Sequence, residues 1–265
     1  MDLGLRNAAA MVVGGGRGMG LASARCLAED GARVAVVGRT QAVLDDAATD
    51  LVQRGSPNAL GLVADTADGE QVQRAFDELS ARWGGELNIL INAVGPGSVG
   101  TFDELTDDQW RAAFDDGVMG MVHCVRSALP LLRKAQWGRI VNFSAHSTQR
   151  QSAILPAYTA AKAALTSISK NLSLQLAKDE IMVNVVSPGS IASEALVGWA
   201  ASVGVDGTDP YALMSAIDEH FGHPAHLPRT GRPDEIGPVV AFLASRRNSY
   251  MTGANVNVDG GSDFT

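Results

Sequence analysis

The sequence predicts a single α/β domain in which a parallel sheet is covered by helices on both faces, a doubly wound fold. Short apolar runs alternate with helical patterns along the whole chain, as repeated strand–helix–strand units do. The apolar runs show no regular alternation with polar residues, which is typical of strands buried on both faces. A length of 265 residues, 46% of them hydrophobic, suffices for one large core.

In the first half of the chain the expected elements follow one another closely. The apolar runs predict strands at residues 8–13, 33–38, 58–65 and 87–95. The helical patterns between them predict helices at residues 21–30, 42–54 and 70–83.

The second half begins with one long helix expected at residues 110–134, opened by a capping box of Thr106 and Gln109. Further strands are expected at 138–145, 181–190 and 253–261, and further helices at 157–178 and 233–245. Residues 191–227 lose this rhythm and are interrupted by Gly, Pro and His. A long irregular segment in a compact domain is usually a lid or binding loop, so we expect a substrate lid there.

Charge and cysteine content restrict the partners and the compartment. A net charge of -8 argues against nucleic acid or an anionic membrane as the main partner, because both need a basic face, and it favours small molecules. Cys26 and Cys124 both fall in expected helices, so neither a disulfide framework nor a zinc site is indicated. The first apolar run is too short to span a bilayer and lacks a basic leader, and we expect a cytoplasmic protein.

A glycine-rich stretch, "VVGGGRGMGLASA", follows the first expected strand and opens a helix. Gly14, Gly18 and Gly20 allow a sharp turn that brings backbone N–H groups to a pyrophosphate at a helix N-terminus. The alternative is a tight turn without a ligand, which the position between strand and helix disfavours. The stretch therefore predicts a dinucleotide site.

The end of the second expected strand bears on the choice of cofactor. An NAD-selective site carries Asp or Glu here to hold the ribose 2′-hydroxyl, whereas this chain has Gly38 and Arg39. With Arg39 and Arg17 nearby, a 2′-phosphate is the better ligand, so NADP is favoured and NAD remains possible. The alternative is that Arg39 is a solvated charge at a strand end.

Tyr158 and Lys162 lie four residues apart in an expected helix and so share one face. A nearby ammonium favours phenolate and would lower the tyrosine pKa from about 10, which would make Tyr158 a usable acid or base. Alone, this pair also occurs by chance on exposed helices.

Five motifs together are more specific than any one of them. "VGGGRGMG", "INAVG", "YTAAK", "SPGSIAS" and "MTGANVNVDGG" occur in the order and spacing of the short-chain dehydrogenases/reductases, which this chain resembles over essentially its full length. It is similar in particular to 3-oxoacyl-acyl-carrier-protein reductases and hydroxysteroid dehydrogenases. The resemblance implies a Rossmann-type single domain, a homotetramer or homodimer, and hydride transfer between a nicotinamide and a carbonyl or alcohol.

The resemblance also implies roles for the residues that match its motifs. Tyr158 would be the general acid/base, and Lys162 would bind the nicotinamide ribose and lower the tyrosine pKa. The implied cofactor contacts are Gly14, Arg17, Gly18, Met19 and Gly20 at the glycine loop, Arg39 at the adenosine 2′ position, Asp65 and Thr66 near the adenine, Asn92, Ala93 and Gly95 at the adenosine ribose side, and Pro188, Gly189, Ile191 and Ser193 at the nicotinamide end.

Two departures from the family pattern concern catalysis. Ala145 stands where the family has a serine that hydrogen-bonds the substrate carbonyl, and loss of such a donor costs about 2.7 to 4 kcal/mol of transition-state stabilisation. Ser144 and Ser147 are the candidate replacements for this donor. Ser144 is expected to point away from the substrate unless the strand bulges, and Ser147 to point toward it if the chain stays extended. His146 is a weaker candidate. Gly117 replaces the family's asparagine, and a local helix kink there can expose a carbonyl to water.

Two readings of function follow. The first is an NADP(H)-dependent enzyme that interconverts a carbonyl and an alcohol on an oxoacyl, steroid or polyketide type of substrate. The second, motivated by Ala145 and Gly117, is a cofactor-binding sensor, scaffold or non-redox enzyme.

The expected lid bears on the substrate and on metal binding. Its apolar residues indicate an apolar substrate or packing within the protein: Leu196, Trp199, Tyr211, Leu213, Met214 and Phe221. No metal site is expected, because Pro224 disrupts a helical presentation of His220, His223 and His226.

Overall fold

Seven parallel strands form one sheet within residues 2–262, the part of the chain that the computed structural model describes. The strand order is β3-β2-β1-β4-β5-β6-β7, and each neighbouring pair is parallel. The strands are β1 Ala9–Val13, β2 Arg33–Gly38, β3 Ala59–Val63, β4 Ile89–Asn92, β5 Gly138–Phe143, β6 Ile181–Pro188 and β7 Asn255–Val258.

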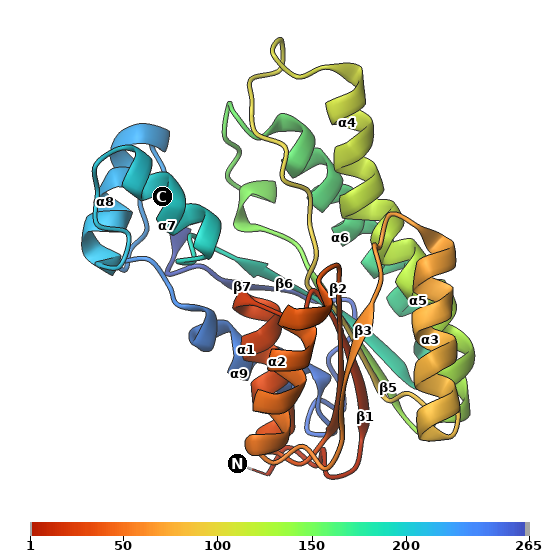
Figure 1. Cartoon of the computed structure of the whole chain (residues 1–265). Helices are drawn as coiled ribbons and strands as arrows, with labels where there is room; N and C mark the ends of the chain where they lie inside the picture. Colours follow the sequence, from red (N-terminus) through yellow and green to blue (C-terminus); the bar gives the residue numbers. More distant parts are fainter. Residues whose placement is uncertain (1, 263–265) are drawn as a thin grey trace.

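Helices cover both faces of this sheet (Figure 1). Helices α1, α2 and α9 pack on one face, and α3, α5 and α6 pack on the other, which confirms the predicted doubly wound architecture. The helix bounds are α1 Gly18–Glu29, α2 Gln41–Gln53, α3 Gly69–Trp83, α4 Asp107–Phe114, α5 Gly120–Lys134, α6 Pro156–Leu176, α7 Glu194–Ser202, α8 Pro210–Phe221 and α9 Pro233–Ala244. Within residues 2–262, none of the helices combines the length and the apolar character needed to cross a bilayer.

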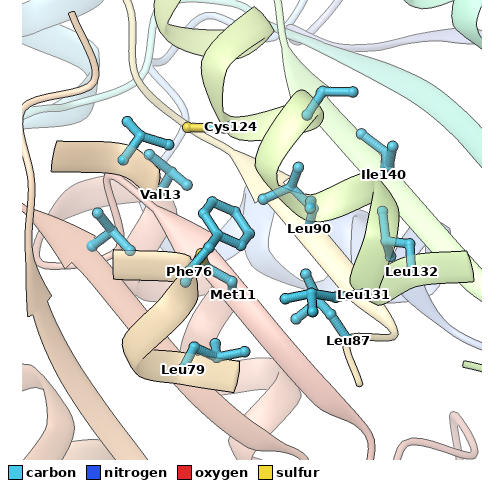
Figure 2. Close-up of a cluster of buried hydrophobic side chains, with 14 of the residues drawn as sticks. Met11, Val13, Phe76, Leu79, Leu87, Leu90, Cys124, Leu131, Leu132 and Ile140 are labelled. Carbon is cyan, nitrogen blue, oxygen red and sulfur yellow. The ribbon is translucent and has the colours of Figure 1, made fainter. Parts of the chain in front are cut away.

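The two faces of the sheet explain why the strands are apolar without alternation. Successive side chains of a strand point to opposite faces, so Met11 packs among the residues of α3 and α5 while Val12 packs toward α1 and α9. Figure 2 shows the first of these clusters, with Met11, Phe76 and Leu132 contributed by β1, α3 and α5. Both faces are buried, so both sets of positions must be apolar.

The strand order reverses beside β1, which has β2 on one side and β4 on the other. In open parallel sheets, the chains leaving the carboxyl ends of the two strands at this point diverge to opposite faces and leave a crevice, where ligands bind. The fold therefore directs attention to the segments that follow β1 and β4.

The long helix expected at residues 110–134 is interrupted. Helix α4 begins at the predicted capping box, in which Gln109 N donates to Thr106 Oγ1 at 3.3 Å and Thr106 N donates to Gln109 Oε1 at 2.8 Å. A π-helix at Asp115–Met119 then separates α4 from α5. Gly117 lies in this π-helix, and a Cβ atom there would lie 3.0 Å from side-chain atoms of both Ala161 and Pro96. The missing side chain lets the bulge pack against α6 and the loop after β4.

The expected lid contains two helices that the sequence did not predict. Helices α7 and α8 lie together at one end of the molecule (Figure 1). The side chains of Ser193 and Asp209 cap their N-termini, accepting from Leu196 N and Tyr211 N respectively. Their apolar residues form a cluster separate from the two sheet clusters, so this segment packs largely on itself.

Candidate active site

The glycine loop folds back tightly between β1 and α1. Gly14 and Gly18 adopt positive φ angles of 77° and 53°, which favour glycine. A Cβ atom on Gly20 would collide with the carbonyl oxygen of Gly14, and a Cβ atom on Gly14 would lie 2.9 Å from Ala93 O. The loop thus needs glycine to pack against the end of β4, with the N-terminus of α1 at the rim of the crevice, where a phosphate is favoured.

A cavity of about 450 Å³ opens at the carboxyl ends of β1 to β4. Its walls come from the glycine loop and from the segments that follow β2, β3 and β4. It brings together seven of the predicted cofactor residues: Gly14, Arg17, Arg39, Asp65, Thr66, Ala93 and Gly95.

Asn92 does not line this cavity. Its side chain is 4% exposed, and Nδ2 donates to Asn142 Oδ1 at 2.8 Å between β4 and β5. Asn142 Nδ2 in turn donates to Ser169 Oγ on α6. The Asn92 side chain therefore lies within the sheet, where it pairs with Asn142, and it does not line the nucleotide cavity.

The charges of the nucleotide cavity include one group that sequence reasoning missed. Asp116, in the π-helix, also lines the cavity. Burial raises the pKa of Asp116, the nearby Asp65 carboxylate raises it further, and Arg39 opposes the change. Arg17 forms an exposed ion pair with Glu194 of α7 at 2.9 Å, linking the glycine loop to the lid. No local signal marks Asp116, because the π-helix that positions it was not predicted.

Tyr158 lies in the first turn of α6, which begins at Pro156, and Lys162 follows one turn later. Lys162 is 3% exposed, and its Nζ donates to Phe143 O at 2.7 Å and to Val94 O at 3.2 Å. The ammonium is therefore held between the ends of β4 and β5. One of its three protons has no acceptor in these contacts.

The pKa values of the pair differ from the expectation. Burial raises the pKa of Tyr158 to about 12 and lowers the pKa of Lys162 to about 8. The expected acidification of Tyr158 by Lys162 is thus wrong for the protein's own groups, because burial of the phenol dominates. The phenol stays protonated at neutral pH.

Ser144 follows β5, and its hydroxyl is used within the protein. Ser144 Oγ donates to Lys162 O at 3.3 Å and accepts from Thr166 Oγ1 at 2.7 Å. Both partners belong to α6, the helix that carries Tyr158. Ser144 thus ties this helix to the end of the sheet.

Ser147 lies in a 3-10 helix at His146–Thr148, so the chain does not stay extended as its predicted orientation required. Ser147 is nevertheless buried at the wall of a second cavity, and its Oγ accepts from Thr159 Oγ1 at 3.3 Å. Ala145 lines the same cavity with its methyl group.

This second cavity, of about 440 Å³, contains Tyr158 and the predicted nicotinamide-end residues. It lies between the end of β5, the start of α6, the segment after β6 and the lid helices. The lining is predominantly apolar: Met19, Val99, Ala145, Ile154, Leu155, Pro188, Ile191, Ala195, Leu196, Trp199, Ile217 and Phe221. The remaining lining residues are Gly189 and polar groups: Ser144, His146, Ser147, Ser152, Tyr158, Ser190, Ser193 and His223.

The apolar residues of the lid divide between the two roles that the sequence left open. Leu196, Trp199 and Phe221 line the cavity. Leu213 and Met214 are buried within the lid's own cluster, and Tyr211 is 58% exposed.

The evenly spaced lid histidines have different neighbours. The His220 ring lies 5.6 Å from that of Trp199, and the His223 ring lies 6.0 Å from that of His146. His226 is exposed and packs beside Gly261. Among residues 2–262, no three His, Cys, Asp or Glu side chains are grouped as metal ligands.

Comparison with known proteins assigns this arrangement to a family. Residues 13–263 match a family model described as enoyl-(acyl carrier protein) reductase. The chain is 30% identical to the 3-oxoacyl-(acyl-carrier-protein) reductase of Chlamydia muridarum, over 97% of this chain and 98% of that protein. It is 29% identical to the meso-2,3-butanediol dehydrogenase of Serratia marcescens, over 97% of this chain and 94% of that protein.

A solved structure extends the similarity to three dimensions. The crystal structure of L-sorbose reductase from Gluconobacter frateurii, complexed with NADPH and L-sorbose, matches with a TM-score of 0.93 at 31% sequence identity. The match covers 100% of each chain.

Proposed function

The chain belongs to the short-chain dehydrogenase/reductase family and is an oxidoreductase, and we propose that it reduces the carbonyl group of a mainly apolar substrate with NADPH. The observation that carries this proposal is the position of Tyr158 in the wall of a largely apolar cavity that also includes Met19, in the first turn of α1 after the glycine loop. A volume of about 440 Å³ accommodates a medium-sized ring ketone or oxoacyl group.

The residues of the nucleotide cavity fit NADP. The close approach of the glycine loop to β4 suits a pyrophosphate. A 2′-phosphate is suited by Arg17 and Arg39, since no carboxylate stands at the end of β2 to repel it. NAD remains a possible second cofactor. When bound, the nicotinamide supplies the hydride for the carbonyl carbon.

The proton for the carbonyl oxygen comes from Tyr158. A phenol with a pKa of about 12 is protonated at neutral pH, so it is ready to donate in the direction of reduction. Lys162 would use its third Nζ proton to hold the nicotinamide ribose, since Phe143 O and Val94 O take the other two.

The donor that Ala145 lacks is proposed to be Ser147. The Ser147 hydroxyl accepts from Thr159, which leaves its own proton for a group in the cavity. Ser144 instead has a positioning role, because its proton goes to Lys162 O and thereby holds α6.

We further propose that residues 191–227 act as the substrate lid, joined to the glycine loop through the pair of Arg17 and Glu194. Apolar groups at the surface of α6 and α9, with Leu174 72% and Phe242 38% exposed, suit association into a homotetramer or homodimer. The two free cysteines suit a reducing cytoplasm. Light scattering of the purified protein tests the assembly.

The test of the activity is a survey of oxoacyl thioesters, steroid ketones and ring ketones, with NADPH oxidation as the readout. We expect turnover of at least one apolar ketone, and a higher kcat/KM with NADPH than with NADH. Tyr158→Phe is the matched control, because it removes the proton donor and leaves the ring in the cavity wall. This variant should lose most activity and keep its affinity for NADPH.

Two outcomes would contradict the proposal. One is tight NADPH binding with no oxidation by any ketone, which would favour the non-redox alternative. The other is a Tyr158→Phe variant as active as the wild type, which would place the proton donor elsewhere.

A further inference from the structure

Two histidines meet in the wall of the substrate cavity, although they lie far apart in the sequence. His146 follows β5 and His223 follows α8. Their rings are in edge contact, with centroids 6.0 Å apart and an interplanar angle of 79°. Both residues line the cavity that contains Tyr158.

Backbone carbonyls determine which nitrogen of each ring carries the proton. His146 Nδ1 lies 3.2 Å from Pro188 O, and His223 Nε2 lies 3.2 Å from Gln151 O. A carbonyl oxygen only accepts, so both of these nitrogens must be N–H donors. In the neutral ring of His146, Nε2 is therefore an acceptor.

The surroundings keep His146 neutral. Burial lowers its pKa below the usual value, and the neighbouring His223 and Arg150 lower it further. The carbonyl of Pro188 and the carboxylate of Asp259 act in the opposite direction but do not reverse the shift.

His146 Nε2 is buried and has no hydrogen-bond partner within residues 2–262. Buried polar atoms in folded proteins are almost always paired, so an unpaired one calls for a partner from outside the chain's own contacts, such as a water or a ligand. His146 lines the ligand cavity, so the donor that this acceptor lacks can come from a bound ligand.

This acceptor cannot replace the missing serine. The reacting carbonyl oxygen is itself an acceptor, and two acceptors do not form a hydrogen bond. Among the described residues, the lining of the cavity includes no Asp, Glu, Lys or Arg, so nothing there compensates a charged donor such as an ammonium. A neutral hydroxyl is the donor that suits this environment.

We propose that His146 Nε2 accepts a hydrogen bond from a second hydroxyl group of the substrate, so that the preferred substrates are ketones with a neighbouring hydroxyl and the products are diols. This inference rests on the proposed carbonyl reductase function and narrows its substrate class. Ser152, in the same lining, provides a hydroxyl that can donate to the oxygen of that group, while the Ser147 proton serves the carbonyl oxygen.

Ligand pairs that differ by one hydroxyl test the inference. Calorimetry of the protein saturated with NADP would compare 1-phenylethane-1,2-diol with 1-phenylethanol. Turnover with NADPH would compare 2-hydroxyacetophenone with acetophenone. We expect the wild type to favour the hydroxylated member of each pair by about tenfold, the size of one buried neutral hydrogen bond.

Two variants isolate the acceptor. His146→Asn can still donate to Pro188 O from its amide but has no atom at the Nε2 position. The preference for the hydroxylated ligand should therefore disappear in this variant. His146→Gln places an amide oxygen near the Nε2 position and should restore part of the preference for the hydroxylated ligand. His226→Asn is the control, because His226 is exposed and outside the cavity lining, and it should keep the full preference.

The outcomes separate this inference from the function on which it rests. Two results would overturn the role of His146 and leave the reductase function standing. One is reduction of both ketones with no preference for the hydroxylated one, and the other is a preference that persists in His146→Asn. If neither ketone is reduced, the proposed function fails for this class, and the calorimetric comparison of diol and alcohol still decides whether His146 recognises a hydroxyl.

Discussion

Replacement of Lys162 by methionine tests how strongly the fold opposes a charge at the centre of the site. Burial lowers the pKa of Lys162 from 10.5 to about 8. At 1.36 kcal/mol for each pKa unit, this difference corresponds to about 3 kcal/mol of folding free energy lost at neutral pH. Methionine has a similar length and no charge, so it removes this cost together with the hydrogen bonds to Phe143 O and Val94 O.

The sign of the pH dependence follows from proton binding. Between pH 8 and 10.5 the unfolded chain holds the Lys162 proton more strongly than the folded chain, so raising the pH through this window stabilises the fold. Lys162→Met lacks this gain. Between about pH 7 and 11, the free energy of unfolding of the wild type should therefore rise by about 3 kcal/mol relative to the variant.

Urea unfolding of both proteins across this range provides the measurement. All other titrating groups are shared, so the difference between the two curves isolates Lys162. Parallel curves would refute the reasoning, because they would mean that the ammonium has the same proton affinity in the folded and the unfolded chain.

Three further predictions concern the same site. Ultraviolet titration should show a phenol that ionises near pH 12, and this transition should vanish in Tyr158→Phe; a titration curve that the substitution leaves unchanged would contradict this. Gly117→Ala should lower the free energy of unfolding by about 1 to 2 kcal/mol, since overpacking against Pro96 outweighs the helix propensity of alanine. Gly198→Ala, where a Cβ meets nothing within 4 Å, should be neutral or stabilising, and equal losses would count against the argument. Arg39→Ala should weaken NADPH binding about tenfold or more and leave NADH binding unchanged, as measured by calorimetry; an equal loss for both would rule out a 2′-phosphate contact.

Much of the fold could be predicted because it depends on short-range patterns. The apolar runs located the strands, and the capping box at Thr106 located the start of α4. The π-helix after Phe114 escaped prediction, because a π-turn uses the same residue types as an α-turn and depends on how Gly117 packs against Pro96. The lid helices escaped because α7 and α8 bury their apolar residues mainly against each other and not against the sheet.

Part of the candidate site followed from the sequence as well. The glycines after β1 predicted a nucleotide site, and the five motifs together, through the family resemblance, predicted the roles of Tyr158 and Lys162. The direction of the Tyr158 pKa was not predictable, because it depends on burial by residues distant in the chain. Nor was the use of the Ser144 hydroxyl, which is directed to α6.

The amino-acid order by itself determined the layers of this protein, the turn at its glycine loop and the single helical turn between Tyr158 and Lys162. Each of these depends on backbone geometry over a few residues. Only the tertiary structure decided which distant groups meet. The contact of His146 with His223 and the pairing of Arg17 with Glu194 join segments that no local pattern relates. Such contacts arise from the packing of whole elements, and so does the burial that sets the proton affinities of Tyr158 and Lys162.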